Sequence, residues 1–129
     1  MHVVILDDDV SVRRALARLL KTEGMVVTAT ATSDQLFDAL TQETPDCLIL
    51  DLQMPGGMSG LDVLKRLEQL GVRIPTIILT AHGAAGTREA CLNAGAAEFL
   101  RKPVDADLLI ETIQNICGKP SRDTFRPFT

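Results

Sequence analysis

The sequence predicts an α/β domain in which a parallel five-stranded sheet is covered by helices on both faces. Five short apolar runs alternate along the chain with amphipathic stretches, and this alternation is typical of βαβ units joined by right-handed crossovers. One of the runs, Cys47–Leu50, is apolar without interruption, as in strands that are buried on both faces. The length of 129 residues suits one such domain and leaves little room for a second.

The first half of the chain is expected to form two βα units and a third strand. His2–Leu6 is rich in β-branched residues, which favour strands, and Val10–Glu23 carries apolar residues at helical spacing. Gly24 is the expected left-handed stop of this helix. Met25–Thr30 is the second strand, and Ser33–Gln42 is the second helix, with its first residue as the N-cap. The uninterrupted apolar run described above is the third strand.

The second half repeats the alternation. Leu61–Leu70 has leucines and a valine at helical spacing, and Thr76–Leu79 is the fourth strand. Thr87–Ala94 is the weakest expected helix, because alanine and cysteine make up most of its apolar side. Ala97–Leu100 is a short fifth strand, and Asp105–Cys117 is the last helix. We therefore expect five strands and five helices.

Composition limits the classes of function. A net charge of −4 and a pI of about 5.1 argue against a general affinity for nucleic acids or anionic membranes. Aromatic residues make up only 3%, so the core must be aliphatic and base-stacking platforms are scarce. The sequence contains no run of about 18 apolar residues, so no membrane span is predicted. The apolar stretch at the N-terminus is too short for a secretory signal and is soon followed by acidic residues. We expect a cytoplasmic protein with one domain over residues 1–118, and a polar tail or the start of a linker over residues 119–129.

Three cysteines, Cys47, Cys91 and Cys117, are far apart in the sequence and form no CxxC pair. Their odd number argues against a disulfide framework and favours a reducing compartment. All three lie in apolar segments, so we interpret them as small core residues.

Polar residues follow four of the expected strands. Asp7 and Asp8 follow the first, Asp51 the third, Thr80 the fourth and Lys102 the fifth. Because ligands of open parallel sheets bind outside the carboxyl ends of the strands, these side chains are expected to meet at one edge. Each alone has a simpler explanation: an aspartate as the N-cap of the next helix, the threonine in a turn, the lysine as a solvated surface charge.

The combination predicts a site for a phosphoryl group. Neighbouring carboxylates repel one another, and oxygen ligands favour a hard divalent cation such as Mg²⁺. A lysine ammonium adds a second positive charge, so metal, ammonium and hydroxyl would together hold a dianionic, oxygen-rich group. A carboxylate can also be the nucleophile, which gives an aspartyl phosphate.

Residues 2 to about 117 resemble the receiver domain of bacterial two-component response regulators. The resemblance is carried by four motifs, which are weak singly and specific together: Leu6-Asp7-Asp8-Asp9, Leu50-Asp51-Leu52-Gln53-Met54-Pro55, Leu79-Thr80-Ala81 and Phe99-Leu100-Arg101-Lys102-Pro103. It implies a flavodoxin-like doubly wound sheet with strand order 2-1-3-4-5.

The resemblance also implies roles for the acidic residues. Asp51 corresponds to the phosphoacceptor. Asp8 and Asp51, with the backbone carbonyl of Gln53, would hold Mg²⁺, and Asp7 would act on the metal through water. Asp9 lies one place beyond the acidic pair and is assigned no role in the site.

Three further positions match residues that respond to phosphorylation. Thr80 corresponds to the hydroxyl that moves to bond the phosphoryl oxygen, and Lys102 to the lysine that pairs with it. Phe99 occupies the aromatic switch position, although it could also be a simple core residue. The family further implies a cis peptide bond between Lys102 and Pro103.

The function implied is that of a phosphorylation switch. A sensor histidine kinase would donate a phosphoryl group to Asp51 in a Mg²⁺-dependent reaction, and the charge would rearrange the fourth helix, fifth strand and fifth helix. That face would bind an output partner or a second copy of the domain, with transcription as the expected output. The stretch Thr80-Ala81-His82-Gly83 resembles the branch of the family that carries a helix-turn-helix output domain.

Two departures and two alternatives stay open. The loop Gly56–Gly60 has one residue more than is usual in the family, and His82 either tunes the dephosphorylation rate or is an exposed loop residue. The first alternative is a Mg²⁺-dependent phosphatase or phosphotransferase with an aspartate nucleophile. It is disfavoured because Gln53 stands where such enzymes have a second acid, and because no cap domain fits. The second is an interaction module independent of phosphorylation, which the five filled polar positions disfavour.

Overall fold

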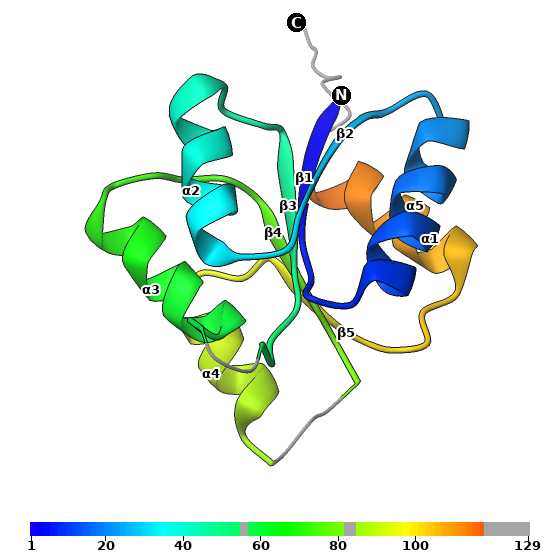
Figure 1. The fold of residues 1–129 in the computed structure, drawn as a ribbon. Helices are drawn as coiled ribbons and strands as arrows, with labels where there is room; N and C mark the ends of the chain where they lie inside the picture. The colour runs from blue at the N-terminus through cyan, green and yellow to red at the C-terminus, as the bar shows by residue number, and fades with distance from the viewer. Residues whose placement is uncertain (55–56, 82–84, 118–129) are drawn as a thin grey trace, which may run out of the picture.

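The computed structural model of this chain describes residues 1–54, 57–81 and 85–117. Within these residues strands and helices alternate in the predicted order (Figure 1). The strands are β1 (His2–Leu6), β2 (Val26–Thr30), β3 (Cys47–Leu50), β4 (Thr76–Thr80) and β5 (Glu98–Arg101). The helices are α1 (Val10–Thr22), α2 (Ser33–Gln42), α3 (Gly60–Gln69), α4 (Thr87–Asn93) and α5 (Ala106–Ile116).

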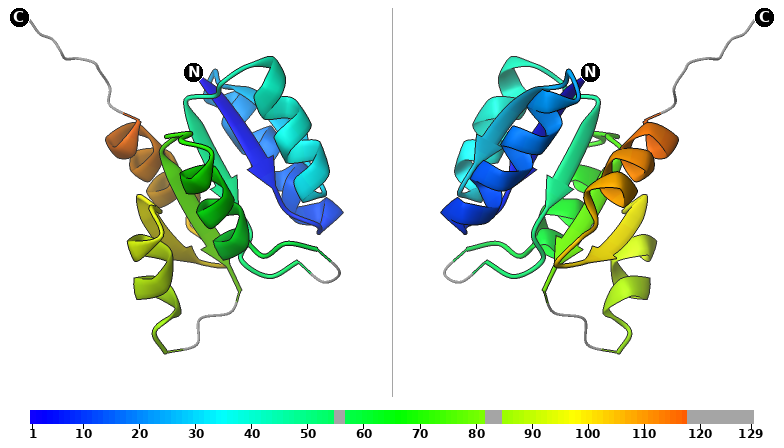
Figure 2. Two further views of the ribbon diagram at one scale, coloured as in Figure 1. Left: turned by 90° about the vertical axis from the view of Figure 1, so that its left-hand side faces the viewer. Right: turned by 90° about the vertical axis from the view of Figure 1, so that its right-hand side faces the viewer.

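The strands form one parallel sheet in the order β2-β1-β3-β4-β5, which confirms the predicted fold class. Helices α2, α3 and α4 pack on one face of the sheet, and α1 and α5 pack on the other. Figure 2 shows the first group in front of the sheet in its left view and the second group in its right view. Because β3 is paired on both sides and covered on both faces, each of its four residues is buried.

Alternate side chains of the central strands supply two separate aliphatic cores. On β3, Leu48 and Leu50 pack with α2, α3 and α4, whereas Cys47 and Ile49 pack with α1 and α5. Removal of one such aliphatic side chain from water stabilises a fold by about 1.5–3 kcal/mol. The sheet is therefore anchored by burial on both faces.

The expected N-cap of α2 is wrong by one residue. Thr32 is the cap: its backbone is extended, and its hydroxyl accepts a hydrogen bond from the amide of Gln35 at 3.1 Å. The amide of Ala31 in turn donates to the Gln35 side chain at 2.7 Å, and Ser33 is already helical. A cap hydroxyl bonds an amide two or three residues later, so Thr32 satisfies an amide that would otherwise lack a partner.

Other element ends differ from the prediction by a residue or two. β5 covers Glu98–Arg101, one residue later than expected, and α3 begins at Gly60. The start of α3 is set by a capping box, in which Ser59 and Asp62 each bond the other's backbone amide. Gly24 has the predicted left-handed conformation, with φ of 83°.

Of the three cysteines, Cys47 and Cys91 are buried as expected, whereas Cys117 is half-buried at the end of α5. No helix among the described residues is long and apolar enough to cross a bilayer. The expectations for Gly56, His82, Gly83 and the tail lie outside the described residues.

Candidate functional site

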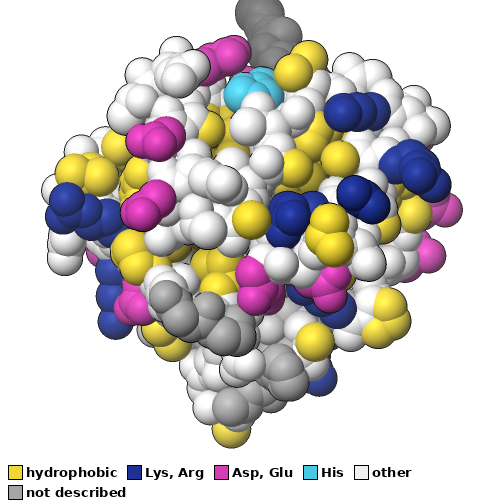
Figure 3. Space-filling view, in the orientation of Figure 1, with side chains coloured by type: hydrophobic (Ala, Val, Ile, Leu, Met, Phe, Trp, Pro, Cys, Tyr) yellow, Lys and Arg dark blue, Asp and Glu magenta, His cyan; other side chains and the backbone are white. Residues whose placement is uncertain are grey.

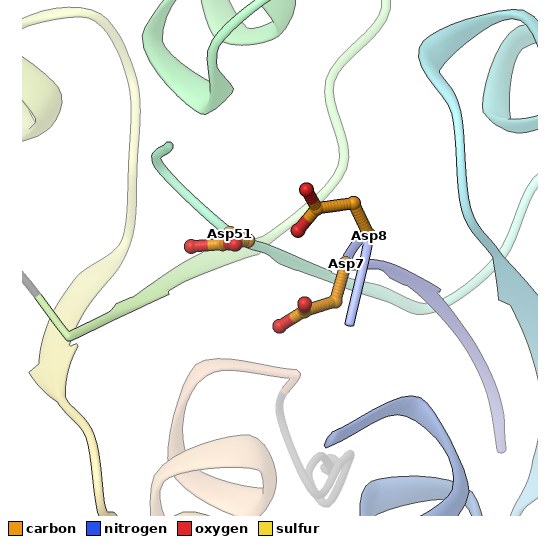
Figure 4. A group of neighbouring side chains, drawn as sticks. All are labelled: Asp7, Asp8 and Asp51. Carbon is orange, nitrogen blue, oxygen red and sulfur yellow. The ribbon is translucent and has the colours of Figure 1, made fainter. Parts of the chain in front are cut away.

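Three aspartates lie together at the carboxyl edge of the sheet. Asp7 and Asp8 follow β1 and Asp51 follows β3, and Figure 4 shows the three side chains gathered there. The strand ladder continues one residue into the site, because the amide of Asp51 donates to the carbonyl of Leu6 at 2.8 Å and that of Asp7 to Thr30 at 3.1 Å. The backbone of both acids is thus held by the sheet.

We call Asp7, Asp8 and Asp51 the acidic cluster. One carboxylate oxygen from each lies within 4.8 Å of those from the other two. Asp7 and Asp51 are buried, with 2% and 7% of their surface exposed, whereas Asp8 is exposed. The cluster therefore opens to solvent on the side of Asp8.

Lys102, which follows β5, brings a positive charge to the cluster. Its ammonium nitrogen lies 2.7 Å from a carboxylate oxygen of Asp7 and 3.7 Å from one of Asp51. Only 18% of the lysine side chain is exposed. Residues 95 positions apart in the chain therefore form a largely buried ion pair, and Lys102 is not the solvated surface charge considered as an alternative.

The two expected switch residues are also buried near this edge. Thr80, the last residue of β4, is fully buried, and its carbonyl accepts a hydrogen bond from the amide of Lys102 at 2.8 Å. Phe99 on β5 is 8% exposed and packs in the core beneath α2, α3 and α4. The peptide bond between Lys102 and Pro103 is cis, as expected.

The capping role considered for the strand-end aspartates is filled by Asp9. One oxygen of its carboxylate accepts hydrogen bonds from the amides of Ser11 at 2.8 Å and Val12 at 3.2 Å. Asp9 therefore caps α1, whereas the Asp7 carboxylate accepts a hydrogen bond from the amide of Asp9 at 2.9 Å and pairs with Lys102.

Two residues that sequence reasoning missed support the site. The guanidinium of Arg13 on α1 donates to the backbone carbonyl of Asp7 at 2.8 Å, which fixes the turn that carries the acidic pair. Gly60 lies so close to the phosphoacceptor candidate that a Cβ there would stand 2.7 Å from the carbonyl oxygen of Asp51. Ser59 before this glycine and Asp62 after it, which form the capping box, are the sequence signal for a constrained helix start.

Burial raises the pKa of Asp51 above its ordinary value, and the nearby charge of Asp7 raises it further. The ammonium of Lys102 and a 3.4 Å hydrogen bond from the amide of Gln53 act in the opposite direction, and Asp8 adds a small increase. On balance the pKa of Asp51 is raised. Without a bound cation, the negative charge of this carboxylate is therefore only partly compensated by its surroundings.

The donor set fits a hard divalent cation. Three carboxylates within 4.8 Å of one another supply oxygen ligands, and the exposed Asp8 leaves room for water. Mg²⁺ binds through one or two carboxylates and keeps several waters, which matches two buried acids beside one open acid. The site can therefore bind Mg²⁺ and, beside it, an anionic group that Lys102 reaches.

Comparison with known proteins identifies relatives in sequence and in fold. The family model for the response regulator receiver domain matches residues 3–114. The DNA-binding transcriptional regulator NtrC of Klebsiella pneumoniae is 41% identical over 103 residues, which are 80% of this chain and 22% of that protein. The transcriptional regulatory protein FixJ of Azorhizobium caulinodans is 35% identical over 119 residues, 92% of this chain and 56% of that protein. The chain thus spans about a fifth to just over half the length of these two relatives.

Solved structures agree with this result. A response regulator receiver protein from Burkholderia phymatum has a TM-score of 0.79 and 43% identity, with 91% of this chain and 94% of that chain covered. A second structure, of a putative response regulator from Chloroflexus aurantiacus J-10-fl, has a TM-score of 0.82 and 31% identity, with 90% of this chain and 96% of that chain covered.

Proposed function

The chain belongs to the response regulator receiver domain family, and on that premise we propose that it accepts a phosphoryl group on Asp51 and acts as a signalling switch. The observation that carries the proposal is the convergence of the acidic cluster and Lys102 at one edge of the sheet. The relatives NtrC and FixJ are transcriptional regulators, so we propose control of transcription as the output.

We assign Mg²⁺ as the cofactor, with the carboxylates of Asp8 and Asp51 and the backbone carbonyl of Gln53 as its ligands and Asp7 acting through water. When bound, the cation neutralises charge on the phosphoryl oxygens. The under-compensated charge of the acidic cluster supports this assignment, because burial and the repulsion from Asp7 raise the pKa of Asp51 and a divalent cation would offset both.

Asp51 acts as the nucleophile. A carboxylate oxygen of Asp51 forms a bond to phosphorus while the bond from phosphorus to the donor group breaks, and the donor leaves with its electron pair. With a phosphohistidine of a sensor kinase as the donor, the imidazole nitrogen is the leaving group. The hydrogen bond from the amide of Gln53 and the close packing of Gly60 hold the Asp51 segment in place for this step.

Lys102 and Thr80 carry the signal away from the site. The ammonium of Lys102 is already 3.7 Å from Asp51, so it can pair with a phosphoryl oxygen without a large movement. The Thr80 hydroxyl then bonds another phosphoryl oxygen, and Phe99 packs into the space that this movement leaves. The backbone hydrogen bond between Lys102 and Thr80 couples the two strand ends.

The partners follow from this chemistry. We propose a sensor histidine kinase as phosphodonor, and an output partner or a second copy of the domain on the face of α4, β5 and α5. Exposed basic residues of α1, namely Arg14, Arg18 and Lys21, would attract an anionic donor toward the acidic edge, and Figure 3 shows basic side chains over this helix. Because an odd number of cysteines favours a reducing compartment, we propose the cytoplasm as the location.

Acetyl phosphate and Mg²⁺ test the proposed reaction. We expect a stoichiometric adduct with the mass of one phosphoryl group, which decays slowly, requires Mg²⁺ and is absent from the Asp51→Asn variant. The Lys102→Ala variant is expected to accept the phosphoryl group without the conformational change, which heteronuclear NMR of β4 and β5 would report.

Each alternative predicts a different outcome. Many turnovers of acetyl phosphate per protein would show a phosphatase instead of a switch. The absence of any adduct would show an interaction module independent of phosphorylation. Normal switching in the Lys102→Ala variant would refute the role that we give to that lysine.

A further inference from the structure

Strand β2 lies at an edge of the sheet, with one side paired and the other open. Its neighbour is β1, and no strand in the part of the chain that the structure describes lies beyond it. The amide of Val26 donates to the carbonyl of Met1 at 2.9 Å. At the other end of the strand, the carbonyl of Thr30 accepts a hydrogen bond from the amide of Asp7 at 3.1 Å. Val26 and Thr30 therefore turn these backbone groups toward β1.

The residues between them alternate in direction. The backbone N–H and C=O groups of successive residues in a strand point to opposite sides, so those of Thr28 face β1 and those of Val27 and Ala29 face the open side. Ala29 is exposed and Val27 is half-buried. The edge therefore offers two donors and two acceptors to a further strand.

This edge lacks the features that commonly prevent strand addition. Residues 25–33 include no charged residue and no proline, and Val26 is 64% exposed. The strand at the opposite edge, β5, carries the charges of Glu98 and Arg101. Charged side chains and proline are among the usual means by which proteins protect an edge. Strand β2 is therefore the less protected of the two edges.

The helices on the two faces beside this edge carry opposite charges. Helix α1 contributes the exposed Arg14, Arg18 and Lys21 and contains no acidic residue. Helix α2 contributes the exposed Asp34 and Asp38 and contains no basic residue. Figure 3 shows this side of the molecule, with basic side chains over α1 and acidic side chains over α2. A strand added here would lie between a positive and a negative flank.

We propose that the β2 edge binds an extended segment of a partner protein by strand addition. Successive side chains of a strand point to opposite faces, so the segment would direct acidic side chains toward α1 and basic side chains toward α2. Backbone hydrogen bonds to Val27 and Ala29 supply affinity, and the alternating charges set register and specificity. This surface is separate from the acidic cluster and from the face of α4, β5 and α5.

The charges disfavour a second copy of this chain as the occupant. Two copies of one edge strand pair antiparallel about a two-fold axis perpendicular to the sheet. Such an axis keeps each helix on its own face, so α1 would lie beside α1 of the second copy and α2 beside its α2. Like charges would then meet on both faces, whereas a segment with alternating charges complements both flanks.

Two synthetic peptides of equal composition test the charge pattern. The first repeats Glu-Lys-Val-Thr twice, which puts glutamates on one face of an extended strand and lysines on the other. The second repeats Glu-Thr-Lys-Val twice, which puts both charges on the same face. In NMR titrations of the full chain, we expect the first peptide to bind about tenfold more tightly than the second and to lose affinity as salt is added.

Hydrogen exchange identifies the backbone bonds. The first peptide should slow the exchange of the Val27 and Ala29 amides and leave that of the Thr28 amide unchanged, because Thr28 already faces β1. Ala29→Pro removes one outward N–H group that β1 does not use, and it should lower the affinity for the first peptide about tenfold.

Charge reversal on α1 gives a second arm if Ala29→Pro does not fold. Arg18→Glu should lower the affinity for the first peptide several-fold, whereas Lys65→Glu, the same reversal at an exposed position of α3, should not change it. Equal affinity for the two peptides, binding of neither, or unchanged exchange at Val27 and Ala29 would overturn the proposal.

Self-association is the remaining outcome. A dimer seen by analytical ultracentrifugation, with the Val27 and Ala29 amides protected before any peptide is added, would make a second copy the occupant and overturn the proposal. None of these readouts requires phosphorylation, so their result is independent of the acetyl phosphate experiment.

Discussion

Replacement of Asp51 by asparagine should stabilise the protein in the absence of Mg²⁺, although it removes the proposed nucleophile. The two residues have nearly the same shape, so the change mainly removes a charge from a site where 7% of the residue is exposed. At an effective dielectric constant of 20, the attraction to Lys102 at 3.7 Å is about 4.5 kcal/mol. The repulsion from Asp7 at up to 4.8 Å is at least about 3.5 kcal/mol.

These two interactions nearly cancel, and the exposed Asp8 adds a smaller repulsion, so the cost of burying the charge and this residual repulsion both favour the neutral asparagine. Burial is the main cause of the raised pKa of Asp51, and we expect Asp51→Asn to be more stable by about 1–2 kcal/mol at pH 8. Because the pKa is raised in the folded state, ionisation of Asp51 destabilises the protein. The gain should therefore vanish below the unfolded pKa of about 3.9 and grow as the pH rises through the folded pKa.

Urea unfolding of the wild type and of Asp51→Asn, without divalent cations, measures this difference at several pH values. Asp38→Asn is the matched control, since it removes the same charge from an exposed position on α2. A concentration of Mg²⁺ 100 times its Kd should stabilise the wild type by about 2.7 kcal/mol and the Asp51 variant far less. An Asp51→Asn protein that is less stable than the wild type at pH 8 without Mg²⁺ would refute the electrostatic account of the site.

Three other substitutions separate the parts of the site. Lys102→Met leaves two buried carboxylates without their cation and should destabilise the protein by about 2–4 kcal/mol in urea titrations; an unchanged midpoint would contradict the ion pair. Gly60→Ala places a Cβ against the Asp51 carbonyl, so it should destabilise the fold by about 1–3 kcal/mol and slow phosphorylation. Gly57→Ala is the control: its Cβ meets no neighbouring atom, so neither stability nor the phosphorylation rate should change. Asp9→Ala should cost about 1 kcal/mol of stability through the lost N-cap and leave the calorimetric Mg²⁺ affinity unchanged; a large loss of affinity would make Asp9 a ligand.

The topology could be predicted from the sequence because burial leaves few arrangements for alternating strands and helices. The unbroken apolar run of β3 requires a central position, and parallel strands bring their carboxyl ends to one edge. The meeting of Asp7, Asp51 and Lys102 follows from that rule alone. Their roles in phosphotransfer rest on the family and stay predictions.

Details that depend on angles between elements could not be predicted. The reach of Arg13 to the Asp7 carbonyl depends on how α1 leaves the strand, and no spacing in the sequence encodes that direction. Two adjacent hydroxyl residues, Thr32 and Ser33, are equally good caps on chemical grounds, and only the backbone conformation distinguishes them.

The continuation of the strand ladder into the acidic edge bears on how far such chains can diverge. Every amino acid except proline has a backbone N–H group. The backbone hydrogen bonds that hold Asp7 and Asp51 therefore do not depend on which side chains the neighbouring residues carry. Substitutions along β1 and β3 need only preserve aliphatic volume for the two carboxylates to keep their spacing. A lineage could therefore exchange most of its interior and still inherit the same chemistry.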